Sequence, residues 1–85
     1  MQAGLPGRFT HTRYRPGYSI AEVEALIERI EGTLGLRARY GPPITAAAVA
    51  AAQFRLVRIK RGYDMREVDD ALDRYQELLR EQGWV

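Results

Sequence analysis

The sequence predicts a small, mainly α-helical domain made of two copies of one structural unit. Eight residues of the first copy recur unchanged 45 positions later in the second. A fixed period of this length indicates that each copy is one supersecondary unit. Two segments also carry apolar side chains three and four residues apart, which is typical of amphipathic helices. The recurring residues, numbered in the first copy, are Phe9, Arg13, Gly17, Tyr18, Glu22, Val23, Arg29 and Leu34.

The single domain, 1–85, divides into a first unit over 8–35, a linker over 36–43 and a second unit over 44–83. Each unit carries an extended arm, RFTHTRY at 8–14 and QFRLVRI at 53–59. Alternating polar and apolar residues favour extended backbone, so the two arms are able to pair as a short β ribbon. Gly17 and Gly62 follow the arms, and we expect them to supply the unusual backbone angles of a sharp turn.

Each long helix is expected to start with a complete capping motif. A Ser or Asp at the N-cap, followed three residues later by Glu, forms a capping box. A Tyr before the cap and a Val after it have the spacing of a hydrophobic staple. The first motif consists of Tyr18, Ser19, Glu22 and Val23, and the second of Tyr63, Asp64, Glu67 and Val68.

Each long helix also carries an apolar seam with the spacing of a coiled coil. We expect the seams to pack against each other or against the same seams of a second chain, so a homodimer is the predicted assembly. Gly35 and Gly83 are the expected C-cap residues, with Trp84 folding back over the last turn. The seam residues are Ile20, Val23, Ile27, Ile30 and Leu34 in the first unit, and Met65, Val68, Leu72, Tyr75 and Leu79 in the second.

A third, shorter helix is expected between the two units. The Pro42-Pro43 pair prevents the first helix from continuing, and Thr45 is placed to cap an alanine-rich helix over 46–54. This helix has no counterpart before Phe9, so the first unit is expected to lack it.

The composition favours a soluble, cytoplasmic protein or a part of a longer protein. The 85 residues include no cysteine, and no apolar stretch approaches the roughly 20 residues of a membrane span. The net charge of +2 conceals an uneven distribution. Acidic residues lie in the long helices, whereas nine cations lie in the connecting segments. These cations either attract an anionic partner or balance the acidic helices of the same molecule.

The residues that perform covalent chemistry are scarce, so we predict a protein that is not an enzyme, with no catalytic residue, metal or cofactor. His11 is the single histidine, and it has no Cys or second His with which to form a metal site. Ser19 is better explained as a helix cap than as a nucleophile, because no histidine is placed to act as its base.

The basic residues beside the glycines are the candidate sites of contact with a membrane or a partner. Each segment has a large apolar residue between cations. If the segments project, the apolar residue is able to enter a lipid headgroup layer while the cations meet anionic lipid. The alternative, which we favour, is that Tyr14 and Ile59 point into the core. The candidate residues are Arg13, Tyr14 and Arg15 in the first unit, and Arg58, Ile59, Lys60 and Arg61 in the second.

The second unit resembles the N-terminal domain of the DivIVA family, bacterial cell-division and polarity scaffolds. The resemblance extends over 44–79, with a shorter version over 9–34. It implies a short helix, a crossed loop and a long helix that dimerises as a parallel coiled coil, with a loop tip that contacts the membrane around Ile59, Lys60 and Arg61. Lys60 stands where the family has its apolar tip residue. The resemblance is carried by Ile44, Thr45, Val49, Phe54, Arg61, Gly62, Tyr63, Asp64, Glu67, Val68, Asp69, Leu72 and Asp73.

These observations lead to three hypotheses of function. The first is a non-catalytic protein-interaction or scaffold module for cell division or polarity, cytoplasmic and peripheral at the inner face of the membrane. The second is a small nucleic-acid-binding protein that uses the cations with Tyr14 and Tyr40 between them, although the helices that would enter a groove are acidic. The third is a purely structural assembly module with a protein partner. Because the sequence ends soon after the last helix, the long coiled-coil region of the scaffolds is absent and the resemblance does not imply a filament-forming role.

Overall fold

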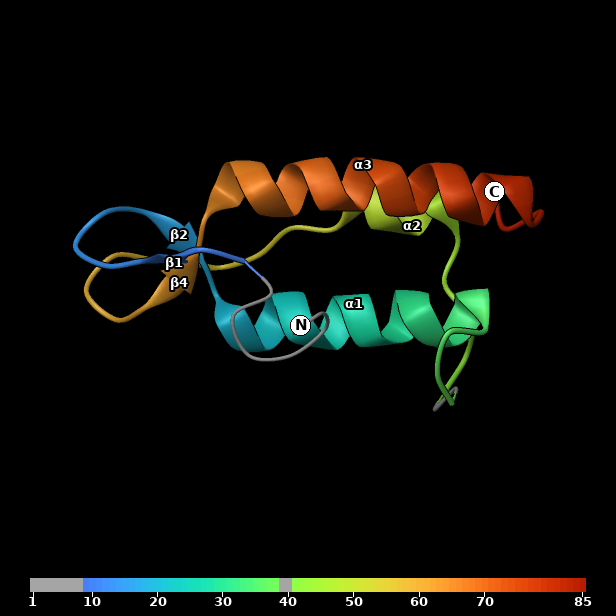
Figure 1. The fold of residues 1–85 in the computed structure, drawn as a ribbon, viewed down its shortest axis with the longest axis horizontal. Coiled ribbons are helices and arrows are strands. Elements are labelled where there is room, and N and C mark those ends of the chain that lie inside the picture. Colours follow the sequence, from blue (N-terminus) through green and yellow to red (C-terminus); the bar gives the residue numbers. More distant parts are fainter. Residues whose placement is uncertain (1–8, 39–40) are drawn as a thin grey trace.

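The computed structural model describes residues 9–38 and 41–85 and contains three helices and a small sheet (Figure 1). The fold is therefore mixed, and the prediction of a mainly α-helical domain is only partly right. The sheet has four short strands in the order β1-β4-β2-β3, all antiparallel. The elements in chain order are β1 (His11–Thr12), β2 (Gly17–Tyr18), α1 (Ile20–Leu34), α2 (Ala46–Ala51), β3 (Leu56–Val57), β4 (Gly62–Tyr63) and α3 (Met65–Glu81).

Each arm pairs with the other unit. β1 pairs with β4, and β3 pairs with β2, so the two arms do not pair with each other as a ribbon. The two central strands meet at Tyr18 and Tyr63, which are equivalent residues of the two units. An arm therefore crosses from each unit to complete the sheet of the other.

The register shows an approximate two-fold axis between the two units. Moving each residue of a strand pair by 45 positions turns one pair into the other, and the Tyr18–Tyr63 pair becomes itself. The chain thus folds as an internal dimer of its two repeats. The equivalent pairs are His11 with Tyr63 and Leu56 with Tyr18, followed by Thr12 with Gly62 and Val57 with Gly17.

Gly17 and Gly62 are required by close packing near this axis, and the expectation of unusual backbone angles was wrong. Positive φ angles among the described glycines occur elsewhere. A Cβ at Gly62 would lie 2.8 Å from Cγ2 of Val57 and 2.9 Å from the carbonyl oxygen of Tyr18. A Cβ at Gly17 would collide with the hydroxyl of Thr12. The absence of a side chain lets the two central strands approach closely.

The N-caps of both long helices are confirmed. The backbone N–H of Glu22 donates to the hydroxyl of Ser19 over 3.4 Å, and that of Glu67 donates to the carboxylate of Asp64 over 3.0 Å. Thr45 caps α2 in the same way, accepting from the N–H of Ala48 over 3.2 Å.

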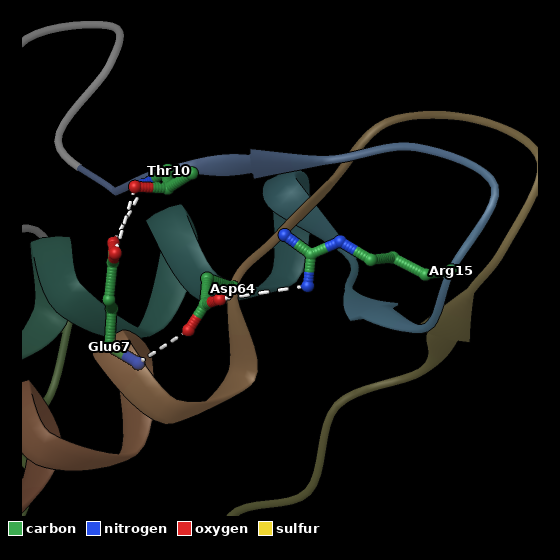
Figure 2. Close-up of polar contacts among 4 residues, drawn as sticks. All are labelled: Thr10, Arg15, Asp64 and Glu67. Carbon is green, nitrogen blue, oxygen red and sulfur yellow. Dashed lines mark hydrogen bonds and ion pairs between the residues drawn. The ribbon is translucent and has the colours of Figure 1, made fainter.

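The second half of each capping box differs from the prediction, because the glutamates bind the other unit. Glu67 accepts hydrogen bonds from the backbone N–H and the hydroxyl of Thr10, at 2.7 and 2.8 Å (Figure 2). Glu22 accepts from the N–H of Arg55 at 2.7 Å. Each carboxylate therefore secures the arm of the opposite unit at the start of its own helix.

The tyrosines before the caps also reach across the axis. The ring of Tyr63 packs edge-on against Phe9, with centroids 5.1 Å apart, and the ring of Tyr18 packs against Phe54 at 5.0 Å. The hydroxyl of Tyr63 donates to Glu24. That of Tyr18 donates at 2.9 Å to Asp69, the residue equivalent to Glu24.

The two apolar seams are buried within one chain. α1 and α3 leave the sheet side by side in the same direction (Figure 1). α2 packs against α3 and adds Ala46 and Val49 to the core. Val23, Ile27, Ile30, Val68, Leu72 and Leu79 are buried, and Ile20, Leu34 and Tyr75 are half-buried against them. Met65 is half-buried and lines an open groove. Apart from Met65, the seams are covered without a second chain.

The helix ends agree with the sequence only in part. Gly35 and Gly83 have left-handed φ angles of 84° and 92°, although the cap residue of α3 itself is Gln82. Trp84 folds back as expected, since its N–H donates to the carbonyl of Leu79 at 2.8 Å. α2 ends at Ala51, short of the predicted 46–54, because the following residues extend to reach β2. The expectation about a leading helix before Phe9 falls on 1–8, outside the described residues.

Candidate functional site

The two loops of the sheet project together from one end of the molecule, beyond the strands and away from the helices (Figure 1). We call residues 13–16 and 58–61 the loop end. The N–H of Tyr14 donates to the carbonyl oxygen of Arg58 over 2.7 Å, which holds the two loops next to each other. The internal two-fold therefore brings together the two basic segments that the sequence places 45 residues apart.

Tyr14 and Ile59 are the exposed apolar residues of the two loops. Tyr14 is 76% exposed and Ile59 is 77% exposed. The favoured interpretation, in which both point into the core, is therefore wrong. Each strand stops two residues earlier, at Thr12 or Val57. The inward and outward alternation of the arm thus does not continue to the tip, and Tyr14 has a positive φ of 65°.

Five cations surround the two apolar tips. No acidic residue occurs in 9–21 or 52–63, so the loop end has one sign of charge. Arg15 forms an ion pair with Asp64, the residue before α3, over 3.9 Å (Figure 2). The guanidinium of Arg13 lies 5.4 Å from the centre of the Tyr14 ring. The five cations, all exposed, are Arg13, Arg15, Arg58, Lys60 and Arg61.

The helix-entry residues position the loop end without forming part of its surface. Gly17 and Gly62 are buried, and the capping glutamates and tyrosines bind the opposite unit. Burial, and then the hydrogen bond and charge of Asp69, raise the pKa of the Tyr18 hydroxyl above its ordinary value. These contacts hold both loops on one rigid base.

Comparisons with protein-family models, with curated proteins and with solved structures find no match.

The described part of the chain provides two further observations. No group of three or more His, Cys, Asp or Glu side chains within it is arranged to hold a metal ion. In the same residues, no helix has both the length and the apolar character that crossing a bilayer demands. His11 is exposed, and its ring lies 5.6 Å from that of Tyr63.

Sequence reasoning missed Thr10, which binds Glu67 through both its backbone and its side chain. A Glu three residues after an N-cap is the signal of a capping box, and this signal does not distinguish a local partner from one in the other unit. The equal spacing of the two copies was the only available indication of a symmetric exchange.

Proposed function

We propose that this chain is a non-catalytic scaffold module that attaches to an anionic membrane surface through its loop end. Its resemblance to DivIVA domains supports a role in bacterial cell division or polarity, in the cytoplasm at the inner face of the membrane. The observation that carries the proposal is the pair of equivalent, exposed apolar tips, Tyr14 and Ile59, each between cations at the same end.

The magnitudes favour the use of both loops together. A cation close to an anionic bilayer contributes about 1 kcal/mol, and full burial of a large apolar side chain contributes about 1.5–3 kcal/mol. One loop with two or three cations binds weakly, because it must also overcome the loss of translational freedom. Two loops on one rigid base roughly double the favourable free energy without ordering a second chain.

Nucleic acid is the second candidate, and the same five cations favour it. A phosphate backbone, however, gives the exposed Ile59 no apolar environment. The basic surface is also limited to the loop end, because the neighbouring helices α1 and α3 are acidic. Binding of nucleic acid would produce a salt-dependent mobility shift at near-physiological ionic strength, and no shift at low salt would exclude it.

Sedimentation with vesicles of phosphatidylglycerol and phosphatidylcholine tests the proposal. We expect the wild type to bind vesicles rich in phosphatidylglycerol and to be released as salt is added. The variant with Ile59→Ser and Lys60→Ser should bind at least about tenfold more weakly, since it loses one apolar contact and one charge. Vesicle binding by this variant equal to that of the wild type would refute the proposal.

Leu36→Ser is the matched control. Leu36 is 66% exposed and follows Gly35, the C-cap of α1, and α1 ends on the side of the molecule opposite the loops (Figure 1). The Leu36→Ser variant removes an exposed apolar residue just as Ile59→Ser does, so a general loss of hydrophobic surface would weaken the vesicle binding of both variants alike. We expect Leu36→Ser to bind vesicles as the wild type does.

A further inference from the structure

An open groove of about 620 Å³ runs along the side of α3, next to α2 and the extended segment that follows it. Its apolar lining includes Phe54, Leu56, Met65 and Leu72. Leu56 is 52% exposed although it lies in the sheet, and Met65 is a seam residue that has no place in the closed core. The groove therefore exposes apolar surface that the fold of one chain leaves open.

The α3 side of this groove is acidic. Asp69 and Asp73 line it, and the adjoining surface of the same helix carries Asp70 and Glu77 beside the cation Arg74. Asp69 accepts a hydrogen bond from the hydroxyl of Tyr18, and both Asp69 and Asp73 are exposed. An occupant of the groove thus needs an apolar side chain for its lining and cations for its edge.

The second loop of the chain, residues 58–61, has this chemistry. It presents Ile59 between Arg58 and Lys60, with Arg61 following, and all four are exposed. The first loop is less suitable, because Arg15 already pairs with Asp64 and Arg13 lies over the ring of Tyr14. The loop end projects beyond the sheet, away from α3 (Figure 1), so it meets such a groove only on another molecule.

We propose that the second loop of one copy docks into the α3 groove of a second copy. Ile59 rests on Leu56 and Met65, and the flanking cations face Asp69 and Asp73. The contact joins two different surfaces, so each molecule retains one free loop and one free groove. Such a heterologous contact continues from copy to copy unless it closes into a ring.

The contact is small compared with the roughly 1,000 Å² of total buried surface that a stable interface needs. It is therefore expected to be weak, concentration-dependent and sensitive to salt, because its charged partners remain close to solvent. An assembly of this kind forms where copies are concentrated, and anionic vesicles compete with it for the same loop.

Sedimentation of the full chain over a range of protein concentrations tests the inference with two complementary variants. Asp73→Lys reverses a charge in the groove, and the variant with Ile59→Ser and Lys60→Ser removes the loop contact. Neither changes a residue that bonds across the two-fold, and circular dichroism verifies that each folds. At low salt we expect the average mass of the wild type to rise past that of a dimer, and each variant alone to remain at 9.7 kDa.

Mixing the two variants is the decisive step. The groove variant retains a normal loop and the loop variant retains a normal groove, so the mixture should form a one-to-one complex and go no further. A wild-type chain that stays monomeric at every concentration overturns the proposal. So do a wild-type mass that stops at a dimer, self-association of Asp73→Lys equal to that of the wild type, or a mixture with no complex.

Vesicle binding separates this inference from the proposed function. Asp73→Lys leaves the loops intact, so it should bind phosphatidylglycerol vesicles as the wild type does. If Asp73→Lys abolishes self-association and the loop variant still binds vesicles fully, the membrane proposal fails and the groove proposal stands. If the loop variant loses vesicle binding while Asp73→Lys self-associates normally, the groove proposal fails and the membrane proposal stands.

Discussion

Replacing Gly62 by Ala tests whether the two repeats interlock as closely as their register implies. The added Cβ would lie 2.8 Å from Cγ2 of Val57, 2.9 Å from the carbonyl oxygen of Tyr18 and 3.0 Å from the carbonyl carbon of Gly17. Two of these three atoms belong to the backbone of β2. The methyl group therefore fits only if β4 moves away from β2, which weakens the pairing at the two-fold axis.

The expected cost is about 3 kcal/mol of the free energy of unfolding. Overpacking by one methyl group costs about 1–3 kcal/mol, and here the neighbouring backbone limits relaxation. Ala loses less conformational entropy than Gly on folding, and this difference offsets less than about 1 kcal/mol of the overpacking cost. For 85 residues the whole free energy of unfolding is about 4–13 kcal/mol. The variant should thus lose a large share of its stability.

Urea unfolding followed by circular dichroism measures the effect. With a slope near 1 kcal/mol per molar urea, the midpoint should fall by about 3 M. Gly35→Ala is the matched control, because nothing lies within 4 Å of its added Cβ and only the left-handed φ opposes it. That control should cost about 1–2 kcal/mol. A Gly62→Ala protein within about 0.5 kcal/mol of the wild type would refute the close approach of the strands.

Three further outcomes follow from contacts near the two-fold axis. Thr12→Val should raise the free energy of unfolding by about 1 kcal/mol in the same urea assay, because the buried Thr12 hydroxyl has no partner among the described residues. The equivalent residue of the other unit is Val57, so a valine is already present in this environment. A loss of stability would contradict this prediction. Since burial and Asp69 raise the pKa of Tyr18, the folded state holds this proton more tightly, so the contribution of Tyr18 to stability should be fully present below about pH 10 and be lost as the pH rises above it. Tyr18→Phe should reduce that fall, and an identical alkaline profile would count against the contact. Glu67→Ala should lower the free energy of unfolding by about 1.5 kcal/mol, measured by thermal or urea unfolding, and Glu67→Gln should lower it less. Equal stability of the wild type and both variants would show that the hydrogen bonds between Glu67 and Thr10 contribute nothing.

The elements that depend on local spacing were predictable from the sequence. The N-caps Ser19, Asp64 and Thr45, the left-handed Gly35 and Gly83, and the course of both long helices follow from residues within a few positions of one another. Local signals of this kind do not depend on which unit a segment contacts.

The pairings between the units were not predictable, because an exchange across a two-fold leaves no trace in either copy alone. Glu67 has the same spacing whether it caps its own helix or binds Thr10. The exposure of Tyr14 and Ile59 also depends on where β1 and β3 end, and the sheet register fixes those ends. The repeat identified the basic segments as candidates, but only the fold shows that they form one surface.

Tryptophan fluorescence provides the most direct test of whether the loop end is the contact surface. The chain has a single tryptophan, Trp84, which follows α3 next to the C-terminus, and the C-terminus lies at the end of the molecule opposite the loops (Figure 1). A variant with Trp84→Phe and Ile59→Trp moves this reporter to the second loop. On adding phosphatidylglycerol vesicles, we predict a shift of its emission to shorter wavelength and protection from a soluble quencher, with no change for Trp84 in the wild type. Unchanged emission from the loop tryptophan on vesicles that bind the protein would contradict the account.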